Sequence, residues 1–188
     1  MTIPQQLILG LGGAGINTID YIATQHPTAT LAVAETDKTC LEKTSISCKI
    51  QLGNAKIGTG GNLEQGQKLA QDSQDELRTL LAGHDVVFVV AGIGGGTGGG
   101  ASSVVARLAT EMGIACVVIA IMPFIFEGRR HLTNAKQALE NLQAVTQEII
   151  VLSNDDLVKK YGNLSIEQSF SKYDELVWHK INEWLDTH

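Results

Sequence analysis

Two patterns of hydrophobic and polar residues alternate along the chain. Short runs of consecutive apolar residues are typical of strands covered on both faces of a parallel sheet, whereas apolar residues that recur every three or four positions are typical of helices. The runs predict strands over residues 7–9, 30–33, 48–52, 86–90, 114–122 and 149–152. The spaced pattern predicts helices over residues 16–22, 62–81, 101–112, 132–145 and 166–185.

This alternation of strands and helices predicts an α/β fold with a doubly wound, mostly parallel sheet flanked by helices. The run at residues 86–90 has no polar interruption, so we expect it to form a central strand. The sequence shows no internal repeat and no interdomain linker, and we expect residues 1–188 to form a single domain. Ligands of such sheets bind at the carboxyl ends of the strands.

Composition narrows the possible functions. The 188 residues are 44% apolar and 18% charged, which is enough for one buried core and excludes a disordered chain. A net charge of −6 leaves no excess positive charge for nucleic acid or an anionic membrane, so neither is expected as a partner. Cys40, Cys48 and Cys116 show no disulfide or zinc spacing, and the amino terminus lacks a signal peptide. We therefore expect a reducing, cytoplasmic location.

Glycine is concentrated in three clusters, at residues 10–15, 53–66 and 92–100. The first cluster satisfies the dinucleotide fingerprint G-x-G-x-x-G between a predicted strand and a predicted helix, and Glu35 and Asp37 follow at the spacing of a ribose-binding acid. Taken alone, this pattern predicts a dinucleotide such as NAD. A tight turn without a ligand is the alternative, because the fingerprint is only moderately specific.

The third cluster favours a different ligand. Residues 94–100 contain six glycines around Thr97, directly after a buried strand. Glycine loses the most entropy on folding, so this run indicates an anion nest whose N–H groups surround phosphate oxygens while Thr97 donates a further hydrogen bond. Two such loops at neighbouring strand ends predict a nucleoside di- or triphosphate, since a dinucleotide oxidoreductase has no evident use for the second.

Several motifs resemble the tubulin/FtsZ family, in that family's order and along nearly the whole chain. Residues 94–101 are close to its signature G-G-G-T-G-[ST]-G-[SA], and residues 9–17 are similar to its first nucleotide loop. Residues 35–37 resemble its Asn-Thr-Asp segment, residues 122–130 its Lys-Pro-Phe-x-Phe-Glu-Gly-Lys-Lys stretch, and residues 154–157 its Asn-Asp-Lys-Leu. The resemblance implies a GTP-binding fold that polymerises head to tail, in bacterial cell division or a cytoskeleton.

The resemblance also implies a site for GTP or GDP with Mg²⁺. The positions that match phosphate-binding residues are Gly12, Gly13, Ala14, Gly15, Gly94, Gly95, Gly96, Thr97 and Gly98. At the nucleoside end, Asn17 and Asn154 match guanosine contacts, Glu127 a ribose contact, Phe170 the aromatic residue against the base, and Asp174 a polar position of the same helix. Asp174 suits guanine, because a carboxylate accepts a pair of hydrogen bonds from N1–H and N2–H that adenine does not offer.

Some of these residues have a simpler structural interpretation. Glu127 beside Arg129 and Arg130 is consistent with a solvated ion pair, Asn154 with a helix N-cap, and Phe170 with an ordinary core position. Thr97 is also consistent with a helix cap, which is compatible with phosphate contact.

Three positions depart from the family pattern. Glu35 replaces an Asn, Gly99 a Ser or Thr, and His131 an Arg. The last change removes a fixed cation, since histidine is mostly neutral at neutral pH, and we expect a lower affinity for phosphate or ribose unless Arg130 compensates.

The chain reaches His188 within its last predicted helix. In the family, that helix leads to a loop whose acidic residue completes the GTPase site of the next subunit, and then to a second domain. We therefore expect a nucleotide-binding domain with little GTPase activity by itself. The alternatives are an NAD(P)-dependent oxidoreductase with Glu35 on the ribose, and a non-hydrolysing, nucleotide-regulated module that docks on another FtsZ-like subunit.

Overall fold

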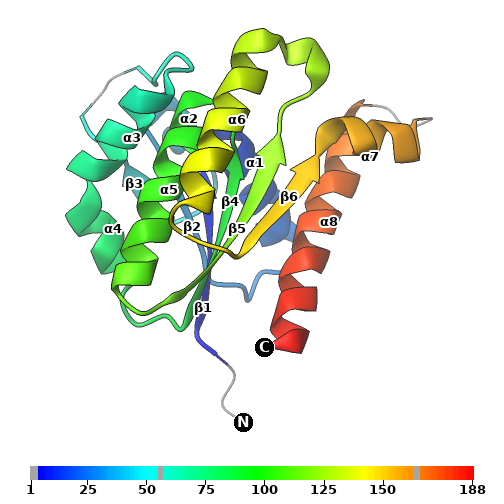
Figure 1. The fold of residues 1–188 in the computed structure, drawn as a ribbon. Helices are drawn as coiled ribbons and strands as arrows, with labels where there is room; N and C mark the ends of the chain where they lie inside the picture. The colour runs from blue at the N-terminus through cyan, green and yellow to red at the C-terminus, as the bar shows by residue number, and fades with distance from the viewer. Residues whose placement is uncertain (1–3, 55–56, 163–165) are drawn as a thin grey trace.

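A computed structural model describes residues 4–54, 57–162 and 166–188, with the backbone alone for residues 157, 158, 161 and 166–170. Its centre is a sheet with strand order β3-β2-β1-β4-β5-β6 (Figure 1). All neighbouring strands pair in parallel. The strands are β1 (Gln6–Leu11), β2 (Leu31–Glu35), β3 (Lys49–Gln51), β4 (Val86–Gly92), β5 (Ala115–Met122) and β6 (Ile149–Ser153). The predicted doubly wound α/β fold is confirmed.

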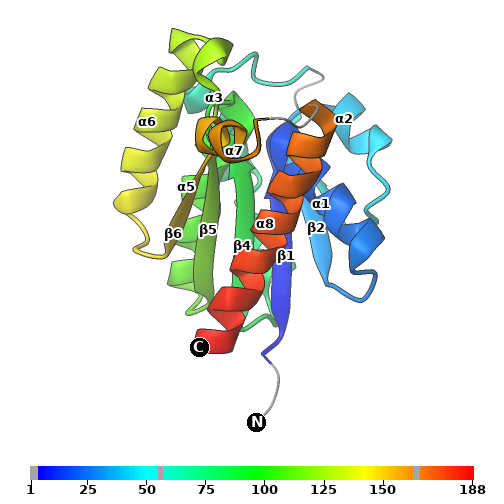
Figure 2. The same ribbon diagram turned by 90° about the vertical axis from the view of Figure 1, so that its right-hand side faces the viewer.

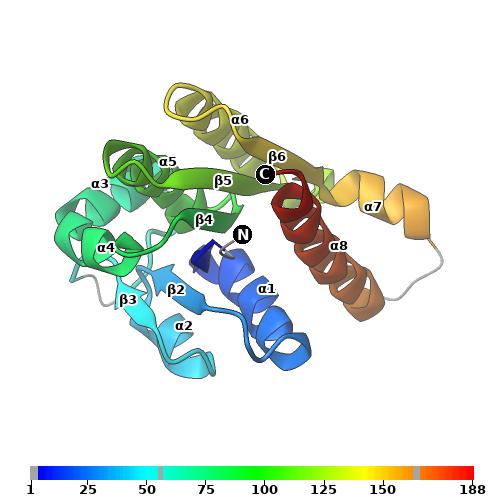
Figure 3. The ribbon, with the colours of Figure 1, turned by 90° about the horizontal axis from the view of Figure 1, so that it is seen from below.

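Helices cover both faces of the sheet, as Figures 2 and 3 show. One face carries α1 (Gly12–Gln25), α2 (Lys38–Lys43) and α8 (Ile166–Thr187). The other carries α3 (Leu63–Asp72), α4 (Gln74–Leu81), α5 (Gly96–Glu111) and α6 (Arg129–Gln143). A short 3-10 helix, η1 (Ile125–Glu127), precedes α6, and α7 (Asn154–Tyr161) follows β6.

The core forms on both faces because side chains alternate along each strand. In β4, Val87 and Val89 pack against α3, α4 and α5, whereas Phe88 and Val90 pack against α1 and α8. The aromatic rings of Phe88 and of Trp184 on α8 form an edge-to-face contact, with their centroids 5.4 Å apart. Strand β4 lies between β1 and β5, so its predicted central position is confirmed.

The structure corrects the predicted helix over residues 62–81, which is two helices that meet at Ser73. The Ser73 hydroxyl accepts a hydrogen bond of 2.7 Å from the Gly53 N–H, and its backbone, with φ −106° and ψ 21°, leaves the helical conformation. Helices α2 and α7 were not predicted, because at six and eight residues each is too short to show a sustained helical spacing of apolar residues.

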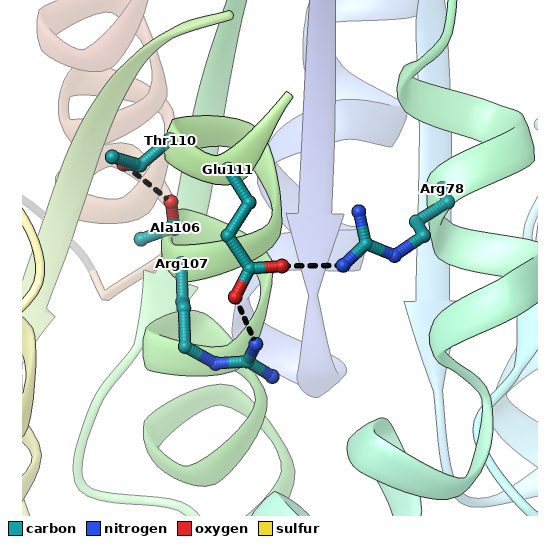
Figure 4. A network of polar contacts seen from close by, with 5 residues as sticks. All are labelled: Arg78, Ala106, Arg107, Thr110 and Glu111. Carbon is teal, nitrogen blue, oxygen red and sulfur yellow. Dashed lines mark hydrogen bonds and ion pairs between the residues drawn. The ribbon is translucent and has the colours of Figure 1, made fainter. Parts of the chain in front are cut away.

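Charged side chains support the amino-terminal side of the sheet, away from the glycine clusters. Glu111 of α5 accepts hydrogen bonds from Arg107 on the same helix and from Arg78 on α4, and Thr110 donates to the Ala106 carbonyl at 2.9 Å (Figure 4). The two guanidinium groups lower the pKa of Glu111. This network ties α4 to the end of α5.

Helix α8 is amphipathic. Tyr173, Val177 and Ile181 face the core, while Lys180 pairs with Glu183 on the outer side at 2.7 Å. Within the part of the chain that the structure describes, no helix is both long enough and apolar enough to cross a membrane.

Candidate functional site

The first and third glycine clusters meet at the carboxyl ends of β1 and β4, where the order of the strands reverses. Helix α1 begins at Gly12, directly after β1, and α5 begins at Gly96 shortly after β4. Gly12 has a φ of 73°, and a Cβ there would lie 2.9 Å from the Gly98 N atom. The two loops are therefore in contact, and Gly12 is required both by its backbone conformation and by this close approach.

Both helices point their amino termini at the same space. The N-cap residues Leu11 and Gly95 make no side-chain cap hydrogen bond, and neither helix has an acidic residue in its first turn. The first N–H groups of α1 and α5 are thus left for a ligand, and the helix dipoles favour an anion there. A cavity of about 380 Å³ lies between the two loops.

Part of the third glycine cluster serves helix packing. Gly99 and Gly100 are inside α5, and a Cβ at Gly100 would lie 2.4 Å from the Leu63 carbonyl oxygen of α3. Across the same contact, a Cβ at Gly66 would lie 2.0 Å from the Gly96 carbonyl oxygen. The glycine richness therefore has two causes: open N–H groups at residues 94–98, and the close approach of α3 to α5.

A second cavity of about 240 Å³ adjoins the first, and the two share Ala14, Ile121 and Asn154 as lining residues. Asn17, Thr18, Tyr173 and Asp174 complete its lining. The Thr18 hydroxyl donates a 2.7 Å hydrogen bond to Asp174 Oδ1. Burial raises the pKa of Asp174 to about 6, against a smaller lowering by this hydrogen bond.

Most of the site residues predicted from the sequence lie around these two cavities. The larger cavity is lined by Gly12, Gly13, Ala14, Gly94, Gly95, Gly96, Thr97, Gly98, Glu127, His131 and Asn154. Asn17 and Asp174 line the smaller one, with Ala14 and Asn154.

Three predicted residues are placed differently. Gly15 lines neither cavity, and a Cβ there would lie 2.4 Å from the Val90 carbonyl oxygen, so this glycine lets α1 pack on β4. Arg130 also lines neither cavity, and its guanidinium donates to the Gly60 carbonyl at 2.9 Å. The side chain of Phe170 lies outside the described residues.

Glu127 and Asn154 do not have the structural roles that the sequence suggested. Glu127 Oε1 accepts from the Phe124 N–H at 2.8 Å, and its Oε2 lies 3.2 Å from His131 Nδ1. Its partner is therefore His131. Asn154 is not the N-cap of α7, because Ser153 caps that helix by accepting from the Asp156 N–H at 3.3 Å.

The middle glycine cluster supplies lining residues that sequence reasoning did not assign. Gly58, Thr59 and Gly60 line the larger cavity. The Asn134 amide of α6 ties this segment to the third cluster, since it donates to the Gly61 carbonyl at 2.9 Å and to the Gly94 carbonyl at 3.1 Å. The concentration of glycines at residues 58–61 is the feature of the sequence that could have identified this segment as part of the site.

Acidic side chains also line the larger cavity, namely Glu35, Asp37 and Glu127. Glu35 is only 5% exposed, and its Oε1 accepts from the Thr36 N–H at 2.6 Å and the Asp37 N–H at 3.3 Å. Asp37 caps α2 by accepting from the Thr39 N–H at 2.8 Å. The end of β2 thus brings two carboxylates to the larger cavity.

Comparisons with known proteins agree with this geometry. The family model "Tubulin/FtsZ family, GTPase domain" matches residues 5–162. The cell division protein FtsZ of Mycoplasmopsis pulmonis is 36% identical over 182 residues, which are 95% of this chain and 47% of that protein. FtsZ 1 of Halobacterium salinarum is 40% identical over 179 residues, which are 93% of this chain and 45% of that protein.

Among solved structures, the empty FtsZ dimer of M. jannaschii is similar with a TM-score of 0.89 and 30% identity, covering 98% of this chain and 55% of that one. The chain spans about half the length of these relatives. The six-stranded parallel sheet with helices on both faces is the fold of that match. The chain belongs to the Tubulin/FtsZ family, through the GTPase domain that its residues 5–162 match.

Proposed function

We propose that this chain binds GTP or GDP, as the nucleotide-binding domain of an FtsZ-type protein of cell division or cytoskeletal assembly. The observation that carries the proposal is the pair of adjoining cavities. One has the open amino termini of two helices, and the other has the half-buried carboxylate of Asp174. A nucleotide has the matching shape, with an anionic end and a flat base that carries donors.

The larger cavity suits the phosphates. Backbone N–H groups at Gly13, Gly95 and Gly96 have no side chain that competes for a ligand, and aligned N–H groups at a helix start are a general anion-binding device. Glu127 and His131 also line the larger cavity, and the family resemblance makes Glu127 the ribose contact. Phosphates in this cavity and a base in the adjoining one would together make a mononucleotide.

The smaller cavity suits guanine. Asp174 has one oxygen engaged by Thr18, and a carboxylate pairs with the N1–H and N2–H donors of guanine. Asn17 and Asn154 offer amide groups that can both donate and accept. Adenine does not offer this pair of adjacent donors, so Asp174 would keep only the hydrogen bond from Thr18, and a polar group shielded from water without its partner is costly.

Mg²⁺ would bind together with the phosphates of the nucleotide. Among the described residues there is no group of three His, Cys, Asp or Glu side chains placed to hold a metal by themselves. Mg²⁺ is usually bound by one or two carboxylates together with phosphate oxygens and water. Glu35 and Asp37 beside the larger cavity fit that requirement, and the ion would neutralise charge between the phosphates.

An NAD-binding oxidoreductase is the weaker interpretation, although the strand order is the one typical of dinucleotide-binding folds. That interpretation assigns Glu35 to a ribose. In the structure, Glu35 Oε1 instead accepts hydrogen bonds from two N–H groups and from the Thr36 hydroxyl. The oxygen of that hydroxyl lies 2.7 Å from the hydroxyl oxygen of Thr97 in the third glycine cluster. Glu35 is thus directed at the phosphate loop.

The direct test is the identity of the nucleotide that accompanies the protein. Purified protein is denatured, and the released small molecules are separated by chromatography. The proposal expects GDP or GTP. Recovery of NAD or of adenine nucleotides instead would overturn it.

Binding should depend on pH through Asp174. Guanine needs the ionised carboxylate, and the pKa of this group is about 6, so the affinity for GDP should be constant well above pH 6 and fall below it, by up to about tenfold per pH unit. The folded state holds this proton more tightly than the unfolded state, so protonation of Asp174 by itself stabilises the fold. Weaker binding at low pH therefore would not reflect unfolding caused by this group.

The measurement is a GDP titration across pH 5 to 8, with the Asp174→Asn variant as the control. The variant should lose the component of the pH dependence that is centred near pH 6. An identical pH profile in both proteins would contradict the assignment.

A further inference from the structure

The smaller cavity is lined by one side chain whose polar atom has no partner. The Tyr173 hydroxyl makes no hydrogen bond to any residue that the structure describes, although its oxygen is shielded from solvent. The side chain is only 4% exposed, and it lines the cavity together with Asn17, Thr18 and Asp174. Tyr173 is not among the residues that the family resemblance assigns to the site.

The position of Tyr173 on α8 directs its hydroxyl toward this cavity. Helix α8 begins at the end of the sheet where the strands end, and it runs antiparallel to them (Figure 2). Side chains of a helix lean toward its amino terminus, so the Tyr173 ring is directed from the core toward the carboxyl ends of β5 and β6. Ile121 near the end of β5 and Asn154 after β6 line the same cavity.

A purely structural role does not account for this hydroxyl. A buried polar group without a partner is costly, whereas phenylalanine would fill the same space in the core without that cost. Burial, together with the nearby Asp174 carboxylate, raises the pKa of the Tyr173 hydroxyl, which therefore keeps its hydrogen at physiological pH. Tyr173 thus offers a ligand one uncommitted donor.

The neighbouring groups define the ligand that would use this donor. The Thr18 hydroxyl is already donated to Asp174 Oδ1, so the cavity presents a carboxylate acceptor and the free hydroxyl of Tyr173 from consecutive positions of α8. On the edge of guanine, the N1–H and N2–H donors that suit a carboxylate lie beside O6, which is an acceptor. A 6-oxopurine paired with Asp174 therefore also carries an acceptor for Tyr173.

We infer that Tyr173 is a base-recognition residue, whose hydroxyl donates to the 6-oxo group of a purine that is paired with Asp174. This inference rests on the proposed function. It adds a contact to a different atom of the base, and it predicts a preference among nucleotides that all carry the N1–H and N2–H donors for Asp174.

The test compares GDP with 6-thio-GDP, in which sulfur replaces O6 while N1–H and N2–H are kept. Sulfur is a weak hydrogen-bond acceptor, so calorimetry in Mg²⁺ should show that the wild-type chain binds 6-thio-GDP roughly tenfold more weakly than GDP. Tyr173→Phe should bind GDP about tenfold more weakly than the wild type, and its ratio of GDP to 6-thio-GDP affinity should be about tenfold smaller. The larger size of sulfur affects both proteins, so the change in this ratio reports the hydroxyl.

Thermal melting of the nucleotide-free chain separates base recognition from packing. Tyr173→Phe should melt at the wild-type temperature or above it, because the substitution removes an unpaired buried group. Tyr21→Phe is the matched control, since it removes the hydroxyl of a half-buried tyrosine on α1 that lines neither cavity. This control should change neither GDP affinity nor the ratio between the two nucleotides.

The inference is overturned if the wild type binds GDP and 6-thio-GDP equally, or if Tyr173→Phe leaves their ratio unchanged. A clearly lower melting temperature of nucleotide-free Tyr173→Phe would also overturn it, because the hydroxyl would then be bonded within the protein. Failure of the wild type to bind GDP would overturn the proposed function and this inference together. GDP binding that depends on Asp174 and not on Tyr173 would overturn only the inference.

Discussion

The Gly95→Val variant is expected to fold like the wild-type chain and to bind GDP roughly 100-fold more weakly or worse, since each hydrogen bond to a charged oxygen contributes about 1.5–3 kcal/mol and the side chain would block more than one N–H donor. Gly95 lines the larger cavity in an ordinary extended conformation, with φ −84° and ψ 161°. A Cβ there would meet only the Gly92 carbonyl oxygen at 3.8 Å. The added side chain would therefore occupy space for a phosphate and strain nothing else.

A substitution at Gly96 would not allow an effect on phosphate binding to be separated from an effect on folding. A Cβ at Gly96 would lie 2.2 Å from Thr59 Oγ1 and 2.6 Å from the Asn62 carbonyl oxygen, so a substitution there would also displace the segment that packs on α5.

The matched control for Gly95→Val is Ala82→Val, at an exposed, non-helical position before β4 at the opposite end of the sheet. Thermal melting should be similar for both variants, and only Gly95→Val should lose GDP in calorimetry. Wild-type GDP affinity in a folded Gly95→Val protein would show that residues 94–98 are not the phosphate site.

The second large effect is expected from Asp174→Asn, which should weaken GDP by on the order of 100-fold and leave ADP nearly unchanged. The amide is almost the same size and can still accept from Thr18, so the fold is preserved. Its NH₂ group, however, would face the N1–H or N2–H donors of guanine. A donor opposite a donor replaces a pair of charge-assisted hydrogen bonds with a repulsive contact.

Glu175→Gln is the matched control, because it removes the charge of the adjacent carboxylate on α8, which is exposed and pairs with Lys172 at 2.7 Å. Competition against a labelled nucleotide gives the ratio of GDP to ADP affinity for each protein. An unchanged ratio in Asp174→Asn would remove Asp174 from base recognition.

The fold was predictable because its main signals are local. The strand segments at residues 86–90 and 116–121 are buried on both faces, and a parallel sheet between helices provides that environment. The glycine clusters after β1 and β4 were also visible in the sequence. Gly12, for example, has a positive φ, and a Cβ there would lie too close to a neighbouring backbone atom, so the position requires glycine.

The features that sequence reasoning missed depend on partners far away in the chain. The break at Ser73 needs the Gly53 N–H, and the position of Arg130 needs the Gly60 carbonyl. Helix α5 begins at Gly96, before the predicted start at residue 101, although glycine disfavours helices. Its packing against α3 outweighs that intrinsic preference, and no local pattern reports the close approach of Gly66.

The chemistry of the candidate site divides in the same way. Family motifs identified Gly12, Gly95 and Asp174, which line the two cavities. The hydrogen bond between the Thr97 and Thr36 hydroxyls was out of reach of sequence reasoning, because the two residues are about sixty positions apart in the chain. A motif specifies which groups are present, whereas their hydrogen-bond partners decide which of them donate.

The most direct test of guanine-nucleotide binding is a parallel titration of the wild-type chain with labelled GDP, ADP and NAD⁺ in Mg²⁺. A cavity that pairs a half-buried carboxylate with guanine should bind GDP far more tightly than ADP, because adenine does not offer the paired N1–H and N2–H donors. The predicted result is a strong preference for GDP over both other ligands. Equal affinities for GDP and ADP, or a preference for NAD⁺, would contradict it.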